Sequence, residues 1–204
     1  MTGPRRGRLL AIEGIDGAGK TTLAAALVRS ARRHGLRAVG HREPSDPEIG
    51  RLAQRAARRD AWTSAVYFTV DRARARPALE RALATHDLVV TDRSFYSTLA
   101  YQGSALGPGG RRRIEALSLV ATVPPDRVVL LDLPIPAAVA RLGARGTARG
   151  PLERRRTLER VAVAYRRLAR RHRWTVLDAQ APVGQLVAEV ESLAGPARRP
   201  RRRT

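Results

Sequence analysis

Residues 14–21 read Gly14-Ile15-Asp16-Gly17-Ala18-Gly19-Lys20-Thr21 and fit the pattern G-x-x-x-x-G-K-[ST]. An apolar run at residues 9–13 precedes this segment, and an amphipathic run at residues 21–33 follows it. Glycines let backbone amides turn inward around phosphate oxygens, and a helix that follows directs its positive end at the same anion. Because the pattern stands between a predicted strand and a predicted helix, it predicts a loop that binds the phosphates of a nucleotide.

Lys20 is the only lysine in a chain whose lysines and arginines total 39. Where arginine serves at every other cationic position, a retained lysine indicates a need for a compact ammonium rather than a planar guanidinium. In this motif the lysine reaches the β- and γ-phosphates, and the hydroxyl that follows holds magnesium. We therefore expect ATP with Mg²⁺ on residues Gly14 to Thr22, with Thr21 as a magnesium ligand.

Apolar and amphipathic runs alternate along the rest of the chain. The apolar runs predict strands at residues 9–13, 36–41, 87–91, 127–132 and 174–177. The amphipathic runs predict helices at residues 21–33, 47–59, 62–84, 95–120, 136–142, 152–172 and 183–193, with glycine-rich residues 107–110 interrupting the fourth. Such alternation is typical of a parallel sheet covered on both faces. Together with the loop it predicts the three-layer α/β fold of P-loop NTPases, with a five-stranded parallel sheet and helices on both faces.

The composition fits one folded domain. Hydrophobic residues make up 43% of the 204 residues, enough for a closed core, and we expect a single domain over residues 1–195. The absence of cysteine excludes disulfides and cysteine-ligated zinc. No apolar run is long enough for a membrane span or a secretory signal, so we expect no membrane partner and a cytoplasmic location.

The formal net charge of +21 indicates either a nucleic-acid partner or an anionic small molecule. Five arginines lie in residues 196–204, which predict a basic, disordered tail, but most of the excess charge is spread over the body. Aromatic residues make up only 4%, and no basic patch is interleaved with aromatic side chains. A nucleic-acid-binding P-loop protein is therefore the less favoured alternative.

Asp92 and Arg93 follow the predicted strand at residues 87–91. A carboxylate at the carboxyl end of a neighbouring strand can order magnesium or act on an acceptor oxygen. An adjacent guanidinium can hold a phosphate. The pair therefore predicts the second half of a phosphoryl-transfer site.

Several short segments keep a fixed spacing from the phosphate-binding loop. They are residues 13–22, Arg42-Glu43-Pro44, the pair Phe68 and Arg72, Asp92-Arg93 with Ser97-Thr98 and Tyr101-Gln102, Leu131-Asp132, and Leu177-Asp178-Ala179. Their combination resembles the thymidylate kinase family over about residues 9–190, and is far more specific than any one of them.

The resemblance implies transfer of a phosphoryl group from ATP to dTMP, giving ADP and dTDP. The catalytic residues that it implies are Lys20, Asp16, Asp92, Arg93, Arg145 and Arg149. The residues that it implies for dTMP are Arg42, Phe68, Arg72, Arg93, Ser97, Thr98, Tyr101 and Gln102. Phe68 would stack on thymine, Arg72 would contact its carbonyl, and Tyr101 would crowd the 2′ position. Thr21 and Asp92 would hold Mg²⁺, and the resemblance also implies a homodimer.

Residues 143–154 are rich in glycine and arginine, a composition that suits a lid closing over phosphates. One branch of the family carries a catalytic arginine in the phosphate-binding loop, and the other carries it in the lid. Position 17 is glycine here, so Arg145 and Arg149 become the candidates. Ala148 stands where the family often has an acidic residue, which keeps open a kinase paralogue acting on another nucleotide or nucleoside.

Overall fold

Five strands form one parallel sheet in the computed structural model, which describes residues 6–144 and 154–194. The strands are β1 (Arg8–Glu13), β2 (Ala38–Arg42), β3 (Leu88–Asp92), β4 (Arg127–Asp132) and β5 (Thr175–Asp178). Their order across the sheet is β2-β3-β1-β4-β5, which places β1 in the centre. The predicted α/β fold, with its five-stranded parallel sheet, is confirmed.

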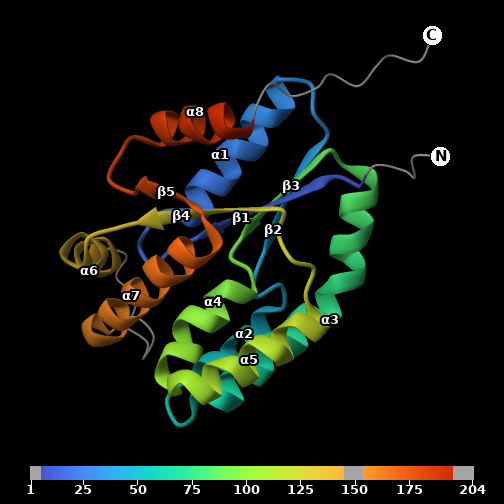
Figure 1. The fold of residues 1–204 in the computed structure, drawn as a ribbon. Coiled ribbons are helices and arrows are strands. Elements are labelled where there is room, and N and C mark those ends of the chain that lie inside the picture. The colour runs from blue at the N-terminus through green and yellow to red at the C-terminus, as the bar shows by residue number, and fades with distance from the viewer. Residues whose placement is uncertain (1–5, 145–153, 195–204) are drawn as a thin grey trace.

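Helices cover both faces of this sheet (Figure 1). They are α1 (Lys20–Arg33), α2 (Pro47–Ala56), α3 (Ala61–Thr85), α4 (Phe95–Tyr101), α5 (Gly107–Ala121), α6 (Ile135–Ala144), α7 (Arg155–His172) and α8 (Val183–Ala194), with a short 3₁₀ helix η1 (Gly103–Ala105). Helices α1 and α8 pack side by side on one face, and α3, α4, α5 and α7 lie on the other (Figure 1). None of the helices in the described ranges is long and apolar enough to cross a bilayer.

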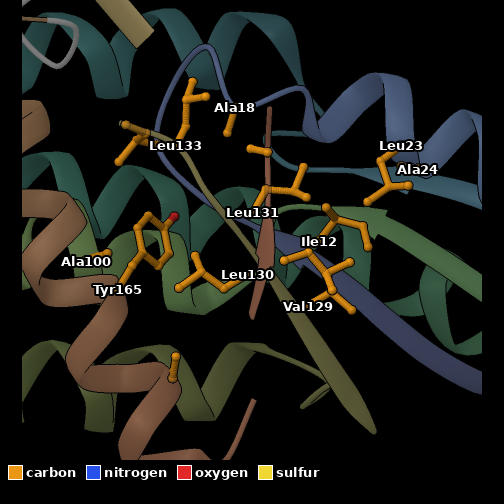
Figure 2. Packing of buried hydrophobic residues seen from close by; sticks show 14 of the residues in the cluster. Ile12, Ala18, Leu23, Ala24, Ala100, Val129, Leu130, Leu131, Leu133 and Tyr165 are labelled. Atoms are coloured by element: carbon orange, nitrogen blue, oxygen red, sulfur yellow. The ribbon is translucent and has the colours of Figure 1, made fainter. Parts of the chain in front are cut away.

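The central strands are apolar on both sides because both sides are covered. Ile12 of β1 and Val129 of β4 are almost fully buried and belong to one core cluster with Leu23 of α1. Figure 2 shows these side chains together, with Tyr165 of α7 beside Leu130 further along the sheet. The sheet is thus held rigidly between two helical layers, and its loops are positioned by that framework.

The largest difference from the predicted helices lies between α4 and α5, whereas α2 ends and α7 begins three residues inside the predicted bounds. The glycine-rich residues 107–110 do not interrupt a helix but begin α5, and the break lies earlier, at η1. Pro108 occupies the first turn of α5, where its missing amide proton and fixed φ cost nothing. Proline near a glycine therefore marks a helix start here.

Candidate active site

A cavity of about 290 Å³ opens at the carboxyl ends of β1, β2 and β3. The strand register brings these ends together, since Asp92 pairs with both Ile12 and Arg42. The cavity is lined by Asp16, Gly17, Gly19, Lys20, Thr21, Thr22, Arg42, Glu43, Pro44, Gln54, Phe68, Arg72, Asp92, Arg93, Ser97, Thr98, Tyr101 and Gln102. It therefore gathers every residue expected to contact dTMP, together with most of the phosphate-binding loop.

The loop between β1 and α1 depends on glycine at two points. Gly14 has a φ of 145°, and a Cβ there would lie 2.6 Å from the carbonyl oxygen of Leu131. Gly19 caps α1 with a φ of 93° and no side-chain hydrogen bond, and the first turn of α1 contains no acidic residue. The first amides of α1 and their positive partial charge are thus left for an anion.

Lys20 is buried at the base of the cavity, only 6% exposed. Its Nζ donates a hydrogen bond of 2.8 Å to the Ile15 carbonyl and lies 4.0 Å from Asp16 Oδ1. Burial, and then the nearby Arg93 guanidinium, lower the pKa of Lys20 to about 8, although nearby carboxylates oppose this. The ammonium is therefore held next to the loop with a cost that a bound phosphate would relieve.

This lowered pKa predicts proton uptake when ATP binds. A phosphate against Lys20 favours the ammonium, so the lysine should gain a proton on binding at about pH 8.5, and little at about pH 7 where it is already charged. Calorimetry in buffers of different ionisation enthalpy measures this uptake. Lys20→Met, which cannot titrate, is the control, and equal uptake by both proteins would contradict the assignment.

Thr21 and Asp92 meet across the cavity, and their geometry fits a divalent cation. The Thr21 hydroxyl donates to Asp92 Oδ2 at 2.5 Å, and Asp92 Oδ1 is buried without a hydrogen-bond partner. Within the described ranges no three His, Cys, Asp or Glu side chains cluster as a metal site. A hydroxyl and one carboxylate suit Mg²⁺, which keeps most of its ligands as water and phosphate oxygens.

Arg93 has a positive φ of 78°, which is uncommon outside glycine. Its guanidinium pairs with Asp16, donates to Ser97 Oγ at 3.1 Å and lies over the Tyr101 ring. The Tyr101 hydroxyl in turn accepts from the Asp16 amide at 3.0 Å. Arg93 therefore links the phosphate-binding loop to α4. Burial alone would raise the pKa of Asp16, but Arg93 and Lys20 outweigh it and the pKa falls.

Glu13 is a functional residue that sequence analysis left without a role. Its carboxylate is fully buried and accepts from the Ser94 amide and hydroxyl at 2.8 and 2.7 Å, from Ser97 Oγ at 2.7 Å and from the Tyr165 hydroxyl at 2.8 Å. Burial raises its pKa, against these hydrogen bonds and Arg93. Glu13 thus fixes Ser94 and Ser97, which follow Arg93 in the chain, and the signal for it was an acid at the end of an apolar strand.

Arg72 also lines the cavity, one turn after Phe68 on α3. Its Nε donates to Glu43 Oε2 at 2.7 Å and its Nη2 donates to the Thr98 hydroxyl. Its Nη1 is buried with no hydrogen-bond partner. Glu43, whose own role the sequence did not indicate, therefore orients a donor that stays unsatisfied until something enters the cavity.

The remaining predicted residues differ in how they are placed. Ser97 and Gln102 line the cavity but already bond to Glu13 and Ser64, whereas Arg42 is exposed at the rim. The other loop residues, Gly14, Ile15 and Ala18, shape the loop from outside the cavity lining. Arg145 and Arg149 lie outside the described residues, as do most of the predicted lid and the basic tail.

A phosphate-binding loop between β1 and α1, facing a carboxylate on the adjacent β3, defines a P-loop phosphotransferase. The thymidylate kinase family model matches residues 12–190. The thymidylate kinase of Xanthomonas oryzae pv. oryzae is 39% identical over 194 residues, 92% of this chain and 82% of the relative. The probable thymidylate kinase of Metallosphaera sedula is 34% identical, over 88% of each chain. The chain belongs to the thymidylate kinase family.

Proposed function

We propose that this protein transfers the γ-phosphoryl group of ATP to dTMP and releases ADP and dTDP. The names of its relatives support this reaction. The observation that carries it is that one cavity is lined by Lys20, by Asp92 and by Arg72 with its unsatisfied donor. In this proposal the phosphates of ATP and the base of dTMP would occupy one cavity.

Mg²⁺ is the proposed metal. Thr21 and Asp92 would hold it, Asp92 through the buried Oδ1 that lacks a partner. When bound, the ion neutralises charge on the β- and γ-phosphates of ATP. Lys20 would then add a positive charge from the loop side.

The acceptor is expected to lie along α3 and α4. Phe68 lines the cavity and would stack on the base, and Arg72 would offer Nη1 to a carbonyl oxygen of the base. Thr98 would complete the base-reading set and Tyr101 would crowd a 2′-hydroxyl. Arg42 at the rim and Arg93 would hold the acceptor phosphate. Hydrogen bonds from a guanidinium to a phosphate are charge-assisted and geometrically specific.

The chemical step needs little from the protein beyond position and charge. An acceptor phosphate oxygen attacks the γ-phosphorus in line, and the bond to the β-phosphate oxygen breaks. Lys20 and the lid arginines would offset the charge on the transferring group, while Asp16 keeps Arg93 aligned for the acceptor phosphate. Offsetting this charge suits Lys20, whose ammonium is already held at the Ile15 carbonyl before any substrate binds.

Arg72→Gln is expected to raise the KM for dTMP by about 10- to 100-fold, because one charged hydrogen bond contributes about 1.5–3 kcal/mol. The KM for ATP should change little, since Arg72 bonds to Glu43 and Thr98 rather than to the phosphate-binding loop. Steady-state kinetics with each substrate varied checks this split. Arg74→Gln is the matched control, as Arg74 is exposed on the same helix. A selective rise in the KM for ATP would contradict the role.

A homodimer is also proposed, through one face of α3 and the adjoining α2. Leu52, Trp62, Val66 and Val70 are 37–44% exposed, and the last three are spaced four residues apart on α3. A second copy would bury this apolar row. Val66→Asp should shift the molecular mass measured by light scattering toward the monomer. Val120→Asp, on the exposed part of α5, is the control and should not.

Product analysis tests the proposed reaction. With Mg-ATP and dTMP, we expect stoichiometric ADP and dTDP by chromatography, and no transfer after chelation of the metal. ATP hydrolysis without a phosphorylated acceptor would overturn the kinase assignment.

A further inference from the structure

A second cavity, of about 600 Å³, lies between η1, α5 and α7 and shares no lining residue with the first. We call it the arginine groove. Its apolar wall is formed by Leu99 of α4 with Val163, Ala164 and Leu168 of α7. Its size falls within the range of about 300–1,000 Å³ usual for small-molecule sites.

Positive charge dominates the arginine groove. Arg111, Arg160, Arg167 and Arg171 line it, against a single acid, Glu115. Arg171 Nη1 lies 3.9 Å from Glu115, and Arg160 Nε donates to the Ser104 hydroxyl at 3.1 Å. Among the described residues, no carboxylate pairs with Arg111, Arg160 or Arg167.

Two arginines outside the groove show the carboxylate pairing that Arg111, Arg160 and Arg167 lack. Arg166, the neighbour of Arg167, makes two hydrogen bonds to the Asp132 carboxylate at 2.9 and 3.0 Å. Arg37 pairs in the same way with Asp87. Guanidinium groups gathered at one concave surface without such partners repel one another unless an anion joins them.

The start of α5 adds to the same field. Gly107 and Pro108 line the groove, and α5 begins with no side-chain cap and no acid in its first turn. The positive end of the helix macrodipole is therefore not neutralised there. Arginines, a helix start and an apolar wall thus meet at one cavity.

We propose that the arginine groove binds a small organic polyphosphate, a molecule with two or three phosphates and an apolar or planar part. The phosphates would meet the guanidinium groups, which match phosphate oxygens in pairs. The planar part would cover Leu99 and Leu168. A nucleic-acid strand fits less well, because no aromatic side chain lines the groove to stack its bases.

The test is calorimetry with inorganic tripolyphosphate, which also reports the phosphate-binding loop. The double variant R111A/R167A is expected to bind one equivalent fewer than the unmodified protein. The control R112A/R170A removes the same charge from the same two helices, outside the groove, and should bind as many equivalents as the unmodified protein. Unfolding temperatures confirm that both variants fold.

Equal weakening by both double variants, or no loss in R111A/R167A, would overturn the proposal, because the charge would then act only as a diffuse field. dTTP without metal tests the organic part. At the site lost in R111A/R167A it should bind about tenfold tighter than tripolyphosphate, which corresponds to about 1.4 kcal/mol. Equal affinity would overturn the assignment of an organic ligand.

Discussion

Lys20→Arg is expected to lower kcat by about 10²-fold or more, because charge stabilisation in the transition state is usually the largest catalytic contribution. The side chain is 6% exposed, and its Nζ sits 2.8 Å from a backbone carbonyl of its own loop. A planar guanidinium keeps the charge but cannot occupy that space or turn toward phosphate oxygens as an ammonium does. Single-turnover kinetics at saturating Mg-ATP and dTMP measures the loss in the chemical step.

The reverse exchange on the same helix is the control. Arg29→Lys changes an exposed residue of α1 and should leave kcat unchanged. Unfolding temperatures for both variants separate a catalytic loss from a misfolded loop. A near-normal kcat for the folded Lys20→Arg protein would show that this side chain does not contact the transferring group.

The double variant R145A/R149A is expected to lower kcat strongly, by about 10²-fold or more, with a smaller change in ATP affinity. The described part of the chain supports the need for such arginines. Position 17 is glycine, Arg72 is bonded to Glu43 and Thr98, and Arg93 is paired with Asp16. Arg141 donates to the Gly17 and Ala179 carbonyls, so it too is engaged.

Arg29 and Arg33 provide a matched comparison for the lid pair, since they are also four residues apart in the sequence. Both are exposed on α1. R29A/R33A removes the same charge and should retain full kcat. If R145A/R149A also keeps full kcat, the charge on the γ-phosphoryl group is neutralised elsewhere, and the lid assignment is wrong.

The sheet was predictable because its strands are short, apolar and separated by clear helix signals. All five strands lie within two residues of the predicted bounds. Helix ends were harder, as α5 shows: glycines that look like a break become a helix start once Pro108 stands in the first turn. Such choices depend on packing that the local sequence does not contain.

The cavity lining was predictable where motifs carry it, from Lys20 and Thr21 to Arg72 and Tyr101. The residues that position those side chains were not predictable from the sequence. Glu13 and Glu43 each stand without an acidic neighbour in the sequence. Only the fold brings Glu13 within hydrogen-bond distance of Tyr165, which is 152 positions away. Positioning residues act through contacts distant in sequence, so no spacing pattern reveals them.

The hydrogen bonds that hold Arg72 also bear on whether a nucleotide other than dTMP could be the acceptor. Arg72 is held by Glu43 and Thr98 with one donor left over, which suits a single carbonyl at a fixed place. A pocket built in this way rejects bases that leave the donor unpaired. We therefore expect a base with a carbonyl at that place to be favoured over adenine, which has no carbonyl.

The most direct measurement of the central claim is a competition in one vessel. Limiting protein with Mg-ATP receives equal concentrations of dTMP, dCMP, dGMP, UMP and AMP, and the initial rate of each diphosphate is followed by chromatography. We expect dTDP to form fastest. The ratio of its initial rate to those of the other diphosphates should fall with Arg72→Gln but not with Arg74→Gln. Equal or faster phosphorylation of another monophosphate by the unmodified protein would contradict the assignment of dTMP as the acceptor.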